Sequence, residues 1–222
     1  MRGRQKSVDA LFLAETLASR LCHDLSGEVN ALAGAVEEIR DSACPDRDAI
    51  ELANDACEAL VRRLRLARAA WGGLGGPMEM EEWRTMVDFM PRRGVTLALD
   101  GVSETGFFTP TAARLTLNVL LLATESLPAG GVVEVSGKPE RDLLVRIRGP
   151  RAAWPAGMAG MMADPAEAID HLRRIDGMAA AKTLQASLIA LIAHATGHRI
   201  SFLLGPQTED APPLLVALAP VA

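Results

Sequence analysis

Apolar residues recur at intervals of three and four along the N-terminal third of the chain, the spacing of amphipathic helices. The first run extends from about Val8 to Asp41, and "DSACPDRD" then interrupts it, with Pro45 placed to open a second helix. The second run forms a heptad seam of Ile50, Ala53, Cys57, Leu60, Leu64, Ala67 and Trp71. The pattern predicts a hairpin of two long helices. Because a lone hairpin leaves apolar stripes exposed, we expect two copies to form a dimeric four-helix bundle.

The pattern changes after "GGLGGP", residues 72–77, which is typical of a linker. Expected helices then lie around 78–90, 110–127, 165–176 and 180–196, and expected strands at 94–100, 132–137, 142–149, 198–204 and 214–220. The Met-rich stretch "RAAWPAGMAGMMAD" is expected to be a loop. One antiparallel sheet packed against helices gives an α+β fold, with a helical-hairpin domain at 1–73 and an α/β sandwich at 74–222.

Composition and charge limit the classes of partner that the chain is expected to bind. The chain has 222 residues, of which 49% are hydrophobic and 4% aromatic, and its formal net charge is −5. A chain with this net charge has no strong positive electrostatic field to attract the phosphate backbone of a nucleic acid, so we expect no nucleic-acid partner. Its most apolar window, Leu184 to Thr196, is too short to cross a membrane, so we also expect no membrane partner.

The three cysteines, Cys22, Cys44 and Cys57, are an odd number and lack CxxC spacing. The two that fall inside predicted helices are expected to be small buried hydrophobes. A reducing cytoplasm is the simplest setting for such a chain.

His23 is the candidate for chemistry, in the stretch "ASRLCHDLSGEVNALAG". Leu21 and Leu25 each lie about 200° from it around the helix, so we expect it to face solvent. Its face carries Thr16, Ser19, Arg20, Gly27, Asn30 and Gly34. Each glycine on an exposed helix costs about 1 kcal/mol against alanine, which favours a surface that another protein approaches closely; tolerated surface residues are the alternative. A neutral imidazole is a nucleophile that can accept a phosphoryl group and hand it on.

The stretch "SRLCHDLSGEVNALAGAVEEI" resembles the phospho-acceptor box of histidine kinases, and more closely that of the ChpT-type histidine phosphotransferases. The resemblance covers essentially the whole chain. It implies that His23 accepts the phosphoryl group and that Asp24 is the neighbouring acid, which assists as a base in kinases. Two positions depart from the kinase pattern: Glu28 replaces a proline, and Gly27 replaces the polar residue used for phosphatase activity. Phosphatase activity of that type is therefore not expected.

The second domain resembles a degenerate kinase ATPase domain. In "RLTLNVLLLATESLPAGGVVEV", Asn118 matches the first asparagine of the kinase N box, but Leu122 stands where a magnesium ligand is expected. "VRIRGPRAAW" places Arg148, Gly149 and Pro150 where the adenine-binding Asp-x-Gly run should begin. We therefore expect no ATP binding, no metal and no cofactor of the chain's own, and we interpret Asn118 as a structural polar residue near a domain edge.

The resemblance implies a homodimeric phosphotransferase that shuttles phosphoryl groups between the aspartates of receiver domains, which bring their own magnesium. The receivers are those of a hybrid histidine kinase and of response regulators. Residues expected to contact them are Arg20, Gly27, Asn30, Arg62 and Arg65, within an arginine group that also includes Arg63 and Arg68. Arg146, Arg148 and Arg151 form a second candidate contact. For both groups a merely solvated face is the alternative.

Other functions stay open. The chain could be an ATP-dependent histidine kinase with an unusual nucleotide site, or a dimeric scaffold whose His23 is never modified. Adjacent His23 and Asp24 could also indicate a metal-dependent phosphohydrolase, but the other histidines lie far along the chain. Among those, His194 and His198 have the spacing of a zinc pair; Gly197 between them predicts a helix end, and no supporting ligands are evident.

Overall fold

A computed structural model describes residues 2–41, 47–72, 75–90, 94–174, 178–203 and 211–219. The chain divides into two compact units, Met1–Arg68 and Ala69–Ala222. The boundary expected between residues 73 and 74 lies outside the described residues, so it stays a prediction.

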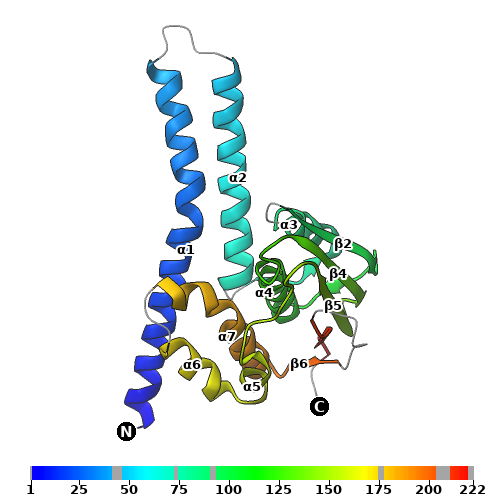
Figure 1. Cartoon of the computed structure of the whole chain (residues 1–222). Coiled ribbons are helices and arrows are strands. Elements are labelled where there is room, and N and C mark those ends of the chain that lie inside the picture. Colours follow the sequence, from blue (N-terminus) through cyan, green and yellow to red (C-terminus); the bar gives the residue numbers. More distant parts are fainter. Residues whose placement is uncertain are drawn as a thin grey trace. The chain divides into compact units, whose positions relative to one another are not determined.

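The first unit is the predicted helical hairpin. α1 (Arg2–Asp41) and α2 (Arg47–Trp71) run side by side in opposite directions (Figure 1). α1 begins six residues before the expected start, because the apolar spacing fades there while no residue breaks the helix. Pro45, expected to open the second helix, lies outside the described residues.

The residues of α2 that are buried lie beside the predicted seam and not on it. Ala49, Ala56 and Leu66 are buried, whereas Ile50 and Leu64 of the seam are 44% and 45% exposed. The seam positions Ile50, Cys57 and Leu64, which are seven residues apart, are all exposed in the single chain. Periodicity locates apolar stripes but does not say which of them the neighbouring helix covers.

The same ambiguity makes the cysteine prediction wrong. Cys22 and Cys57 are both free thiols with exposed side chains in the single chain, not buried hydrophobes. Cys44 lies outside the described residues.

The second unit contains a five-stranded sheet in the order β2-β4-β5-β7-β6. Its strands are β2 (Val95–Val102), β4 (Gly131–Lys138), β5 (Asp142–Arg148), β6 (Arg199–Phe202) and β7 (Leu214–Ala217). The expected strands are confirmed, but the expectation of a wholly antiparallel sheet is wrong. β2 and β4 pair in parallel, because a helix carries the chain back across the sheet between them.

Helices cover one face of this sheet. They are α4 (Pro110–Glu125), α5 (Met158–Ala163) and α7 (Met178–Thr196), and α6 (Pro165–Arg173) packs against α5 and α7. α4 packs against α7 and against β4 and β5 (Figure 1). The strand residues on this face are almost fully buried: Val133, Val135, Leu143, Val145, Ile147, Leu214 and Val216. α5 was expected to be loop; instead its Met158 and Met161 fill the core, since methionine adapts to irregular gaps.

A small second sheet precedes α4. β1 (Met78–Glu79) pairs antiparallel with β3 (Phe107–Phe108), and α3 (Met80–Val87) follows β1. On α3 the fully buried Trp83 donates from Nε1 to Thr116 Oγ1 at 3.1 Å, and its ring lies 5.1 Å from that of Phe108. Trp83 is therefore a packing residue within the second unit. Strands of two residues are too short to produce a readable alternation, so the small sheet was not predicted.

Candidate functional site

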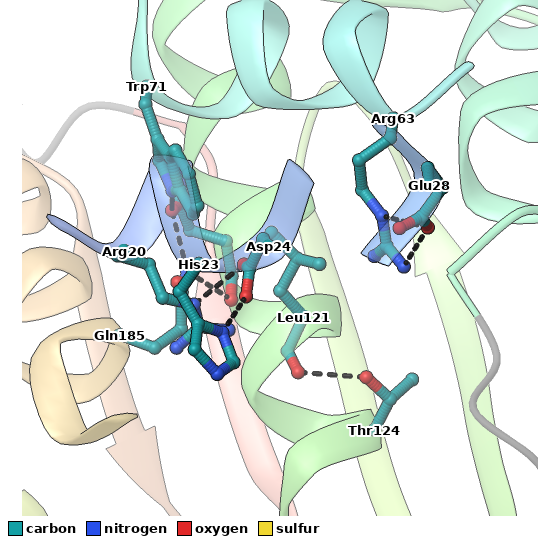
Figure 2. Close-up of polar contacts among 10 residues, drawn as sticks. Arg20, His23, Asp24, Glu28, Arg63, Trp71, Leu121, Thr124 and Gln185 are labelled. Carbon is teal, nitrogen blue, oxygen red and sulfur yellow. Dashed lines mark hydrogen bonds and ion pairs between the residues drawn. The ribbon is translucent and has the colours of Figure 1, made fainter. Parts of the chain in front are cut away.

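His23 projects from α1 with 58% of its side chain exposed, as the helical pattern predicted. Its Nδ1 lies 3.2 Å from Asp24 Oδ1 (Figure 2). A carboxylate oxygen can only accept a hydrogen bond, so this contact assigns the ring proton to Nδ1. The neutral imidazole then keeps its free electron pair on Nε2. The geometry therefore presents one defined nitrogen as a nucleophile.

Arg20 holds the other oxygen of the same carboxylate. Its Nε donates to Asp24 Oδ2 at 2.7 Å, one helical turn from Asp24 (Figure 2). Ion pairs at this spacing form because residues four apart are neighbours on a helix. Arg20, Asp24 and His23 thus form a continuous polar chain along α1.

Two residues expected on the exposed face of His23 are not exposed. Arg20 is 5% exposed and Thr16 is 8% exposed. The Arg20 side chain folds along the helix to Asp24, and Thr16 Oγ1 donates to Phe12 O at 2.8 Å. The expectation of exposure is therefore wrong for both. The role of Arg20 in partner contact stays a prediction.

Gly27, Asn30 and Gly34 do lie exposed on α1. A Cβ atom placed on Gly27 or on Gly34 would meet no other atom within 4 Å. Packing within the described chain therefore does not require glycine at either position. Glycine lowers helix stability at both positions, and because it has no side chain it leaves the surface beside His23 open.

Glu28, which stands at the position of the kinase proline, joins the two helices. Its Oε1 accepts from Nε and Nη2 of Arg63 at 3.3 and 3.1 Å (Figure 2). Sequence reasoning placed Arg63 only in a general arginine group. Because the pair is partly exposed, its net stabilisation is on the order of 0.5 kcal/mol. The pair links α1 to α2 five residues beyond His23.

The other arginines of α2 point elsewhere. Arg62 pairs with Glu58 one turn back on the same helix, and Arg65 and Arg68 are exposed. These arginines form a basic surface on α2, and the carboxylate of Glu58 neutralises part of its positive charge. Their contact with a partner, like that of Gly27 and Asn30, stays a prediction.

Arg146 and Arg148 lie on the face of the sheet opposite the helices. In the strand register Arg146 pairs with Glu134, and Arg148 Nη2 lies 3.4 Å from Glu134 Oε2. Arg151 follows in the left-handed region, with φ 61°. Their role as a second contact surface is not tested by these positions.

Asn118 is fully buried in the second unit. Its Nδ2 donates to the carbonyls of Ala70 and Arg114, both at 2.7 Å. Its Oδ1 accepts from Trp71 Nε1 at 3.1 Å and from Gln185 Nε2 at 2.6 Å. An asparagine amide has two donor hydrogens and two acceptor sites, so all four are used. These contacts agree with the interpretation as a structural polar residue, and they join Asn118 to Ala70 and Trp71, which lie just after the boundary between the two units.

The segment that replaces the adenine-binding run packs closely against its neighbour. A Cβ atom on Gly149 would lie 2.4 Å from the carbonyl oxygen of Gly130. Any side chain there would collide with backbone, so glycine is required for the approach of the two strand ends. A packing role therefore accounts for Gly149 without reference to a ligand.

The histidine pair near the end of α7 does not share a helix. α7 ends at Thr196, Gly197 adopts φ 71°, and His198 N donates to Ala193 O at 3.0 Å. This is the helix end that Gly197 predicted. His194 is exposed, while the buried His198 directs Nδ1 to Thr196 Oγ1 at 2.7 Å. In the described ranges, no three His, Cys, Asp or Glu residues are grouped so as to hold a metal ion. Among the described helices, none has the length and apolarity needed to cross a bilayer.

A family model described as the histidine phosphotransferase C-terminal domain matches residues 80–208, more than half of the chain. The chain belongs to this family. Within it, the protein phosphotransferase ChpT of Brucella abortus (strain 2308) is 25% identical over 133 residues, which are 58% of this chain and 62% of that protein. The match thus spans less than two thirds of the ChpT chain. The resemblance inferred from the Cys-His-Asp-Leu helix is confirmed.

A solved structure supports the fold of this histidine phosphotransferase family member. The structure, described as a bacterial phosphotransferase, has a TM-score of 0.67 and 20% identity, and the match covers 94% of this chain and 96% of the other. The likeness confirms the predicted arrangement of a helical hairpin followed by an α+β unit.

Proposed function

We propose that this chain is a phosphorelay histidine phosphotransferase, in which His23 Nε2 takes a phosphoryl group from a receiver-domain aspartate and passes it to a second receiver. The observation that carries the proposal is the exposed imidazole whose Nδ1 is held by Asp24 at 3.2 Å. It leaves Nε2 available to an approaching protein.

In the transfer step, the Nε2 electron pair forms a bond to phosphorus, and the bond between phosphorus and the aspartyl oxygen breaks. The carboxylate of the receiver leaves with the bonding pair. Positive charge develops on the imidazole ring, and the Asp24 carboxylate opposes it through the Nδ1 proton. Such transfer depends mainly on in-line positioning and charge neutralisation, and the receiver's magnesium supplies part of the latter.

The second unit supports a transferase better than a kinase. Asn118 Oδ1 accepts two hydrogen bonds from the protein, so it has no site left for a cation. Leu122, where a kinase has a magnesium ligand, is 3% exposed and apolar. We therefore propose that this unit serves as a scaffold or docking surface and does not bind ATP.

We also propose that the working form is a homodimer. The hairpin leaves a set of large apolar side chains exposed in the single chain: Val29, Val36, Ile50, Leu52, Val61 and Leu64. A dimeric four-helix bundle would bury the stripe that includes Ile50 and Leu64. The free thiols of Cys22 and Cys57 suit a reducing cytoplasm.

The experiment that tests this function supplies the purified protein with a receiver domain that carries labelled phosphoaspartate and magnesium. Label should move to the wild-type protein and to a His194→Ala control, which removes another exposed histidine, but not to His23→Ala. A parallel sample receives labelled ATP. Labelling from ATP would make the protein a kinase. If no receiver of the same cell labels His23, the remaining alternative is a dimeric scaffold whose His23 is never modified.

A further inference from the structure

We propose that Arg20 is a positioning residue for phosphotransfer: it orients Asp24, and through Asp24 it keeps the His23 proton on Nδ1 and the reactive electron pair on Nε2. The inference rests on the proposed function, because it concerns how His23 is prepared to react. It changes the role expected of Arg20 from a partner contact to an internal one.

The two hydrogen bonds on Asp24 differ in strength. Arg20 Nε lies 2.7 Å from Asp24 Oδ2, whereas His23 Nδ1 lies 3.2 Å from Asp24 Oδ1. The shorter contact joins two full charges, and charge-assisted hydrogen bonds are about twice as strong as neutral ones. The longer contact, to a mostly exposed neutral ring, cannot by itself fix the carboxylate. The orientation of Asp24 is therefore set by Arg20, and the imidazole follows Asp24.

The burial of the three side chains also indicates that Arg20 orients Asp24 and that Asp24 orients His23. The side chain of Arg20 is 6% exposed and that of Asp24 is 20% exposed, whereas that of His23 is 58% exposed. Exposure therefore increases along the chain of contacts from the guanidinium to the imidazole. A residue that docks a partner needs accessible surface, and Arg20 offers little. A residue that orients another side chain from behind needs none.

The arrangement favours the transition state over the resting state. Before transfer, Asp24 accepts a hydrogen bond from a neutral ring. As Nε2 bonds to phosphorus and the receiver's carboxylate departs, the ring becomes cationic and the same hydrogen bond becomes charge-assisted. An interaction that strengthens during the reaction accelerates it. In the return step the bond from Nε2 to phosphorus breaks, the electron pair returns to Nε2, and the Nδ1 proton stays in place. Arg20 therefore serves transfer in both directions.

The kinetic test compares Arg20→Met and Arg20→Gln with the wild type in transfer from the phosphorylated receiver. Arg20→Met should lower the maximal transfer rate between about 10- and 100-fold, the scale of small misplacements of a reacting group. The receiver concentration for half-maximal rate should stay nearly constant. Arg20→Gln, which retains an N–H donor toward Asp24, should recover part of the loss. Arg47→Met is the control, because Arg47 pairs with Glu51 at the same spacing of four residues but on the exposed surface of α2; its rate should equal that of the wild type.

A double substitution tests whether Arg20 acts through Asp24. In an Asp24→Asn background, adding Arg20→Met should produce no further loss of rate. Independent, multiplying losses would overturn the inference. A rise in the half-maximal receiver concentration with an unchanged maximal rate would also overturn it and return Arg20 to partner docking.

A spectroscopic readout separates this inference from the proposed function. Nitrogen-15 NMR of the His23 ring at neutral pH should place the proton on Nδ1 in the wild type and in Arg47→Met. Arg20→Met should increase the fraction with the proton on Nε2. Circular dichroism verifies that each variant keeps its helices, and Arg20→Gln serves if Arg20→Met does not fold. An unchanged tautomer in Arg20→Met would defeat the positioning role even if transfer occurs. If the wild type accepts no phosphoryl group, the function fails, while the tautomer result still decides whether Arg20 orients the ring.

Discussion

The indole Nε1–H of Trp71 donates to Oδ1 of Asn118 at 3.1 Å, so the last residue of α2, which belongs to the second unit, is bonded to the core of that same unit. The same carboxamide caps the Ala70 carbonyl and accepts from Gln185. The position that marks nucleotide chemistry in kinases here joins three helices.

Replacement of Asn118 by alanine should therefore destabilise the protein. It leaves the half-buried Trp71 and the buried Gln185 and Ala70 carbonyl without their partner, and unsatisfied buried polar groups cost about 1–3 kcal/mol each. We expect a loss of about 3 kcal/mol in the free energy of unfolding, measured by urea denaturation. Asn54→Ala, on the exposed surface of α2, is the control and should change it by less than about 0.5 kcal/mol. A loss equally small for Asn118→Ala would contradict the structural role.

The neighbouring acid gives a second prediction. Asp24→Asn keeps an oxygen that can accept from His23 Nδ1 but removes the charge that opposes the cationic ring. We expect the transfer rate from a phosphorylated receiver to fall about 100-fold, the scale of a lost acid-base or charge-stabilising partner. Asp55→Asn, an exposed acid on α2, should leave the rate unchanged. A wild-type rate in Asp24→Asn would mean that the carboxylate takes no part in transfer.

Much of the fold could be predicted because long periodic segments carry strong signals. The helices of the hairpin repeat their pattern over many turns, and the alternation of Val133 and Val135 with polar neighbours marks β4 as half-buried. The parallel pairing of β2 with β4 could not be predicted, since strand direction depends on the whole crossover. α5 was missed because glycine, proline and methionine dominate its sequence, and burial decides its conformation.

The candidate site likewise contains some features that the sequence predicts and others that it does not. His23 and Asp24 follow from their place on the helix, and the Arg20–Asp24 pair has the readable spacing of i and i+4. The bond between Glu28 and Arg63 joins residues 35 apart, and that between Trp71 and Asn118 joins residues 47 apart. Contacts at such separations depend on how elements pack, which a single sequence does not encode in any local pattern.

The Glu28–Arg63 pair predicts a measurable coupling between α1 and α2. In a double-mutant cycle of Glu28→Gln and Arg63→Gln, the coupling in the free energy of unfolding should be about 0.5 kcal/mol. It should weaken at 1 M salt, because the pair is partly exposed to screening ions. The pair Arg40–Asp41, which lies within one helix and is highly exposed, provides a comparison that should show less coupling. No coupling in Glu28–Arg63 at low salt would mean that the pair does not join the helices.

His198 predicts a dependence of stability on pH. Burial lowers the pKa of His198 below its ordinary value of 6.5, although backbone hydrogen bonding at Leu218 and Thr196 offsets part of the effect. Below pH 6.5 the unfolded chain binds a proton that the folded chain does not yet bind, so the unfolded state gains stability. The contribution of His198 to stability should therefore be complete above that pH and decrease as the pH falls toward the lowered folded-state pKa.

Urea denaturation between pH 5 and about pH 7.5 measures this dependence. His198→Gln should flatten the part of the curve below pH 6.5, where the His198 term acts. His194→Gln, which alters the exposed histidine near the end of α7, should keep the wild-type slope. Identical slopes in wild type and His198→Gln would show that His198 is not the group responsible.

The exposed stripe on α2 predicts that one substitution separates a dimer into single chains. Leu64 is 45% exposed in the single chain, in register with Ile50 two heptads earlier. A glutamate at this position would place a charge in the apolar seam of a four-helix bundle, where burial of an unpaired charge is strongly unfavourable. Light scattering coupled to size-exclusion chromatography should give a dimer for the wild type and a monomer for Leu64→Glu. Leu203→Glu, at an exposed leucine of the second unit, should remain dimeric. A monomeric wild type would contradict the proposed bundle, and a dimeric Leu64→Glu would place the contact on another surface.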